Sequence, residues 1–160
     1  ILSQYFIPIG EQQVNAAVIY IALNSLFYIG QMKFKETLKI IVLSFALALG
    51  KSGYYLYNML EPLWFMWLPS WVDNALLVYL VIMLLHQNGQ RMITVIMGMV
   101  ISECFIYFAF TKSGLSYSLF NLIWLDHLAF VCMLLSVWSS IQFISKYFSD
   151  STKQIHKKEV

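Results

Sequence analysis

The sequence carries little charge. Only 11% of its 160 residues are Asp, Glu, Lys or Arg, whereas 60% are hydrophobic. A soluble globular domain has roughly 25% charged residues, and a chain with so few cannot cover itself with a water-compatible surface. Its apolar excess must therefore face lipid, and the mean hydropathy of +0.70 agrees with this. These values exclude a soluble protein and predict an integral membrane protein.

The sequence is also short of the residues and spacings that mark disulfide, metal and catalytic sites. Cys104 and Cys132 both fall inside apolar runs, at depths that differ by about 10 Å, so no disulfide framework is expected. His86, His127 and His156 are scattered, without the His-x-x-x-His or Glu-x-x-His spacing of a metal site. No serine occupies a G-x-S-x-G elbow. We therefore expect neither a cofactor nor an enzyme.

Long apolar runs, separated by short polar loops, fill most of the chain. A bilayer core about 30 Å thick needs roughly 20 apolar residues in a helix. The third run is the least regular, because Pro69 and the tryptophans within Trp64–Val72 are also typical of a segment that lies flat at the interface. We expect an all-α polytopic membrane bundle of five transmembrane helices, with four as the alternative. The expected spans are 14–30, 38–59, 64–85, 92–110 and 119–144.

Lysine and arginine are distributed unevenly over the connecting segments. Cytoplasmic loops of membrane proteins are enriched in these residues. With the N-terminus outside, Lys112 is the only lysine or arginine of the outer segments. The sequence therefore predicts a single N-out, C-in transmembrane domain in a bacterial inner (cytoplasmic) membrane, followed by a basic cytoplasmic tail over residues 145–160. The basic residues of the inner segments are Lys33, Lys35, Lys39, Arg91, Lys146, Lys153, Lys157 and Lys158.

Polar side chains recur at one depth of the expected spans, in the outer half of the membrane. Lys51, for example, lies roughly 12 Å below the outer end of the second span. Ionisable groups inside a membrane are costly, so they normally face the bundle interior and pair. We expect Lys51 to point into protein, with Glu103 or Asp126 as its partner. The complete polar layer consists of Asn24, Lys51, Asp73, Glu103, Asp126 and His127.

Two interpretations of this layer stay open. In the first, it is a buried ion-pair network that fixes the register of the helices. In the second, it lines a water-filled vestibule or binds a cation. Because one lysine faces three carboxylates, full pairing needs a protonated acid, a bound cation, a charged His127 or access to water. A membrane enzyme that uses Asp126 and His127 has less support, since neighbouring helical residues point about 100° apart.

Small residues recur every four positions in the second span. Small side chains at this spacing let membrane helices approach closely. We therefore expect this part of the span to pack against another helix. The residues are Ser44, Ala46, Ala48, Gly50 and Ser52.

The tail ends in a basic cluster that contains Lys153, Lys157 and Lys158. Such a cluster is typical of an anchor on anionic lipid headgroups. A docking strip for a cytoplasmic protein is the alternative, and the cluster is too short for a nucleic-acid-binding module. The sequence favours a non-enzymatic membrane subunit, anchor or sensor that assembles with itself or with other membrane subunits. The alternative is a small channel or transporter for protons or cations.

Overall fold

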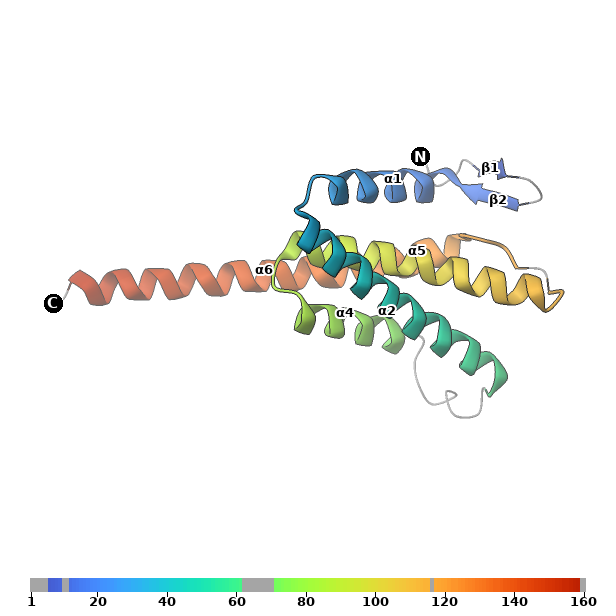
Figure 1. Cartoon of the computed structure of the whole chain (residues 1–160). Coiled ribbons are helices and arrows are strands. Elements are labelled where there is room, and N and C mark those ends of the chain that lie inside the picture. Colours follow the sequence, from blue (N-terminus) through green and yellow to red (C-terminus); the bar gives the residue numbers. More distant parts are fainter. Residues whose placement is uncertain (1–5, 10–11, 62–70, 116, 159–160) are drawn as a thin grey trace.

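The computed structural model describes residues 6–9, 12–61, 71–115 and 117–158, and the side chains of residues 15–61, 71–115 and 117–148. In this part of the chain a short hairpin precedes five helices (Figure 1). The all-helical fold class predicted from the sequence is confirmed. The helices are α1 (Ala16–Gly30), α2 (Phe34–Leu60), α4 (Val72–Leu84), α5 (Asn88–Lys112) and α6 (Leu122–Lys158).

The hairpin is an addition that the sequence did not predict. Strands β1 (Phe6–Ile9) and β2 (Gln12–Asn15) pair antiparallel, with Phe6 opposite Asn15 and Ile9 opposite Gln12. Asn15 then caps α1, because its side-chain oxygen accepts from the backbone N–H of Ala17 at 2.9 Å. Asparagine is a preferred N-cap residue, so the first helix begins at Ala16 and not at residue 14.

Several helices extend past the spans expected from hydrophobicity. Helix α2 starts at Phe34 and α5 at Asn88, each four residues earlier than expected, and α6 continues to Lys158. Lysine, glutamate, glutamine and arginine are good helix formers, so apolarity alone underestimates helix length. The expected tail is thus a continuation of α6. Its 37 residues make a helix about 56 Å long, which projects well beyond the rest of the bundle (Figure 1).

Three of the described segments are long and apolar enough to cross a membrane: Phe34–Leu60, Asn88–Lys112 and Leu122–Phe148. Helices α1 and α4, with 15 and 13 residues, reach only about 22 and 20 Å. A bilayer core is about 30 Å thick, so the count of five spans stays a prediction. Most of Trp64–Val72 lies outside the described residues. Whether this segment spans the membrane or lies flat at its interface is therefore not tested here.

Helix α5 is the centre of the bundle and contacts α1, α2, α4 and α6. Helices α1 and α4 lie on opposite sides of it (Figure 1). Consecutive helices run antiparallel, so connections 31–33 and 85–87 lie at one end, which we call the tail end because α6 projects from it (Figure 1). The hairpin and the connecting residues 113–115 and 117–121 lie at the other end, the hairpin end (Figure 1).

Candidate functional site

One face of α2 packs closely on α5. Ser44, Ala48 and Ser52 are buried there, and Oγ of Ser44 donates to the backbone oxygen of Thr94 at 3.1 Å. Gly98 of α5 lies against the same turn of α2, since a Cβ added to it would be 3.3 Å from the backbone oxygen of Ser44. A larger residue at this position would push the two helices apart.

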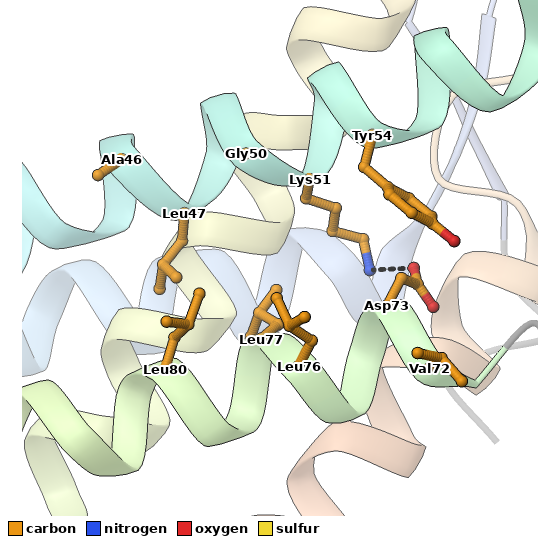
Figure 2. Close-up of a pocket in the computed structure, with 10 residues that line it drawn as sticks. All are labelled: Ala46, Leu47, Gly50, Lys51, Tyr54, Val72, Asp73, Leu76, Leu77 and Leu80. Carbon is orange, nitrogen blue, oxygen red and sulfur yellow. Dashed lines mark ion pairs between the residues drawn. The ribbon is translucent and has the colours of Figure 1, made fainter. Parts of the chain in front are cut away.

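The other two small residues of α2, Ala46 and Gly50, lie on a different face of the helix. Ala46 and Gly50 are exposed and line a groove between α2 and α4 (Figure 2). Positions two residues apart, such as 46 and 48, are separated by about 200° around a helix. The two sets of small residues therefore face different directions, and only one set faces α5.

Lys51 points from α2 toward the first turn of α4 (Figure 2). Its Nζ donates to Oδ1 of Asn74 at 2.7 Å and lies 3.8 Å from Oδ2 of Asp73. The side chains of the ion pair are 13% and 22% exposed, so both are largely withdrawn from solvent or lipid. The expected partners were Glu103 and Asp126. The structure corrects this to Asp73, because α4 begins one residue before it and brings its first turn opposite Lys51.

Asn74 connects Lys51 to His127. The asparagine is fully buried, and its Nδ2 lies 2.8 Å from Nδ1 of His127. An amide nitrogen only donates, so Nδ1 of His127 is the acceptor in this contact. Asn74 is not among the residues of the polar layer expected from the sequence. The available signal was an amide beside Asp73 in an apolar helix, since amides often bond across membrane helices.

Glu103 is held by the α5–α6 connection. It is 4% exposed, and it accepts hydrogen bonds from the hydroxyl of Tyr117, at 3.0 Å, and from the backbone N–H of Phe120. Phe120 has a φ of 53°, which is rare for a bulky residue. Burial and the neighbouring Glu103 raise the pKa of the Tyr117 phenol, so the phenol stays protonated as a donor. Through these hydrogen bonds Glu103, which belongs to α5, holds the strained α5–α6 connection in place.

The two clusters line one cavity of about 190 Å³, which we call the polar cavity. A cavity of this size has room for several water molecules of roughly 30 Å³ each. Two carboxylates, Asp73 and Glu103, share it with the ammonium of Lys51. Within the described part of the chain, Oδ1 of Asp73 and Nε1 of Trp124 are buried there without a hydrogen-bond partner. The polar lining is completed by Tyr55, Tyr117, Asn121 and His127.

Two residues of the expected polar layer are not part of this site. Asp126 is exposed, because its neighbour His127 faces the cavity and adjacent helical positions point about 100° apart. Asn24 is exposed on α1, and its Nδ2 donates to the backbone oxygen of Tyr20 at 2.8 Å. The structure thus brings together Lys51 with Asp73, Glu103 and His127, and leaves Asp126 and Asn24 outside.

A second buried charge, Arg91, lies at the tail end and was treated in the sequence only as an inner-side cation. It is 5% exposed. Its Nε and Nη2 donate to the backbone oxygens of Leu85, at 2.7 Å, and Ile82, at 3.3 Å. Its Nη1 donates to Oδ1 of Asn88 and Oε1 of Gln142, both at 3.0 Å. The guanidinium thus caps the last carbonyls of α4, where the helix dipole favours a cation.

No three His, Cys, Asp or Glu side chains of the described residues lie close enough to hold a metal ion. Cys104 and Cys132 are free thiols. The basic residues Lys153, Lys157 and Lys158 belong to the helical continuation of α6, and their side chains lie outside the described part.

One of the comparisons with known proteins identifies a family of membrane proteins. No curated protein and no solved structure matches the chain. A family model described as YphA-like integral membrane protein matches residues 1–160. This match confirms the prediction of an integral membrane protein that contacts the lipid bilayer. The whole chain therefore belongs to the family of YphA-like integral membrane proteins.

Proposed function

We propose that the chain is a non-enzymatic subunit, anchor or sensor within a larger membrane complex. The structural role in this proposal is supported by the polar network of α2, α4, α5 and α6. Lys51, Asn74 and His127 bond to one another in sequence, and Glu103 bonds to Tyr117. Groups bonded in this way stabilise the helices against one another, because an unpaired polar group in a membrane is costly.

The lengths of α1 and α4 support an assembly with other membrane subunits or with a second copy. At about 22 and 20 Å they are shorter than the roughly 30 Å core of a bilayer. Short helices adjust to a bilayer by thinning it, by reaching outward with flanking residues, or by associating with other helices. Helix α1 also presents large apolar side chains outward, including Leu23 and Phe27.

The proposal includes the N-out, C-in orientation in a bacterial cytoplasmic membrane. It is supported by the basic residues Lys33, Lys35 and Lys39, which lie in or next to a connection at the tail end, where α6 also projects. On this side a basic helical tail meets either anionic headgroups or a cytoplasmic protein. Lys153, Lys157 and Lys158 would make this contact.

The assembly is tested by measuring the mass of the protein in lipid nanodiscs or on a native gel, at several protein concentrations. A stable dimer or higher oligomer, or a co-purifying membrane protein, is the expected result. A monomer without partners at every concentration contradicts the proposal. Removal of residues 151–160 tests the tail separately: a soluble partner retained by the shortened chain rules out docking at the tail.

A small channel or transporter for protons or cations is the second candidate. The observation that favours it is the polar cavity, in which Asp73 and Glu103 share one lysine. Proton and cation flux into liposomes tests it, with Asp73→Asn and Glu103→Gln as the variants and Asp126→Asn, which removes an exposed acid, as the matched control. Flux that vanishes only in the first two variants supports this candidate. No flux in the unaltered protein eliminates it.

A further inference from the structure

An apolar groove of about 270 Å³ lies between α2 and α4 and ends at the Lys51–Asp73 pair (Figure 2). A cavity of about 150 Å³ already holds benzene, so this groove has room for an aliphatic chain. On the α4 side its wall consists mainly of leucines, and on the α2 side small residues leave it open. Besides Lys51 and Asp73, the lining consists of Val72, Leu76, Leu77 and Leu80 on α4 and Ala46, Leu47, Gly50 and Tyr54 on α2.

At the charged end of the groove, one lysine faces two carboxylates. Lys51 and Asp73 line both the groove and the polar cavity, where Glu103 is the second carboxylate. Oδ1 of Asp73 is a buried acceptor without a hydrogen-bond partner among the described residues. A second cation placed at Asp73 would satisfy this oxygen and leave Lys51 to balance Glu103.

The groove has a charged end at Lys51 and Asp73 and an apolar lining that continues toward the middle of α2. Lys51 precedes Leu60, the last residue of α2, by nine residues, which is roughly 14 Å along the helix axis. Ala46 lies near the middle of the same helix. A molecule with its polar head at Asp73 would therefore direct its tail along the groove toward the middle of α2.

We propose that this groove binds a single-chain amphiphilic ammonium ion. The ammonium head donates to Oδ1 of Asp73, the alkyl tail lies along Leu77 and Leu80, and Lys51 turns toward Glu103. Two cations then face two carboxylates. This inference goes beyond the proposed function, because binding in the groove requires neither ion flux nor a partner subunit.

The test is a calorimetric titration of dodecylammonium into the full-length protein in phosphatidylcholine nanodiscs, with empty nanodiscs subtracted. Dodecanol, which has the same chain without the charge, is the matched ligand. Saturable binding of one dodecylammonium per chain is expected, with only bilayer partitioning for dodecanol. Equal saturable binding of both ligands, or none of either, overturns the proposal.

Variants locate the site. Asp73→Asn is expected to weaken binding at least about thirtyfold, because it removes one partner of a buried charge pair. Gly50→Leu fills the groove without changing any charge and is expected to weaken binding about tenfold or more. Gly53→Leu is its control, since neither glycine has an atom within 4 Å of an added Cβ and Gly53 does not line the groove.

Unchanged binding in Gly50→Leu overturns the placement of the tail, even if Asp73→Asn does not fold. Binding that survives Asp73→Asn but not Glu103→Gln places the ligand in the polar cavity and also overturns it. The channel candidate fails or succeeds separately: a protein that binds dodecylammonium but conducts no ions refutes the channel and leaves this inference standing.

Discussion

Nζ of Lys51 lies 3.8 Å from Oδ2 of Asp73, inside a bundle whose outer surface meets lipid. The pair connects α2 to α4, the shortest of the described helices. A buried ion pair stabilises a protein little compared with an apolar pair, whereas loss of one partner is strongly destabilising. The contribution of this pair is therefore best measured by removing its members separately and together.

Lys51→Met is expected to destabilise the protein by about 3–5 kcal/mol, since it leaves Asp73 buried and uncompensated. The free energy of unfolding in mixed micelles, measured by denaturant titration, checks this value. Lys112→Met, which removes an exposed lysine from the last turn of α5, should change it by less than about 1 kcal/mol. The double change Lys51→Met with Asp73→Leu should recover most of the loss. If Lys51→Met is as stable as the unaltered chain, the pair has no structural role.

Gly98→Val is expected to destabilise the contact between α2 and α5 by about 1–3 kcal/mol, because even the first added carbon would lie 3.3 Å from the backbone oxygen of Ser44. Gly53→Val is the matched control: it introduces the same residue into a helix where an added Cβ meets nothing within 4 Å. The same denaturant titration compares the two. Equal losses of stability in the two variants would mean that the close approach of α2 to Gly98 does not contribute to the free energy of unfolding.

Arg91→Gln is expected to destabilise the protein by about 2–3 kcal/mol, since the backbone oxygens of Leu85 and Ile82 lose a charged donor. Arg91→Lys should recover only part of this, because an ammonium cannot reproduce the fork of a guanidinium. Hydrogen exchange at the end of α4, followed by mass spectrometry, gives a local readout. His86→Ala, an exposed change in the same connection, should leave exchange there unaltered. If hydrogen exchange at the end of α4 rises as much in His86→Ala as in Arg91→Gln, the rise in Arg91→Gln is not due to loss of the guanidinium that caps α4.

The predicted orientation requires the two ends of the bundle to face opposite compartments. In a background that carries Cys104→Ala and Cys132→Ala, Ser113→Cys at the hairpin end should react with a membrane-impermeant maleimide added outside intact cells. Lys33→Cys at the tail end should react only after the cells are opened. Both positions are exposed in the structure. Labelling of Lys33→Cys in intact cells would reverse the orientation.

Much of the fold could be predicted from hydrophobic runs alone. These runs located the helices, and their ends were missed mainly where charged residues continue a helix, as at Phe34 and beyond residue 144. The hairpin was missed because Phe6–Ile9 and Gln12–Asn15 are too short to give a strong alternating pattern.

The polar site could be predicted only in part. Counting residues along a helix gives the depth of Lys51 and Glu103, and the structure does place both at one cavity. Depth does not give the direction in which a side chain points, since that depends on how each helix is rotated against its neighbours. This is why Asp126 was expected inside and lies outside, and why Asp73, rather than Glu103, is the acid beside Lys51.

Helix α6 connects the polar cavity to the far end of the molecule without a proline or glycine between Leu122 and Lys158. From His127 to Lys157 it rises about 45 Å. A rigid rod of this kind transmits rotation, so a turn of α6 about its axis at His127 would sweep the backbone of the distal segment through the same angle. A change at the polar cavity that turned α6 would therefore also move the far end of this helix.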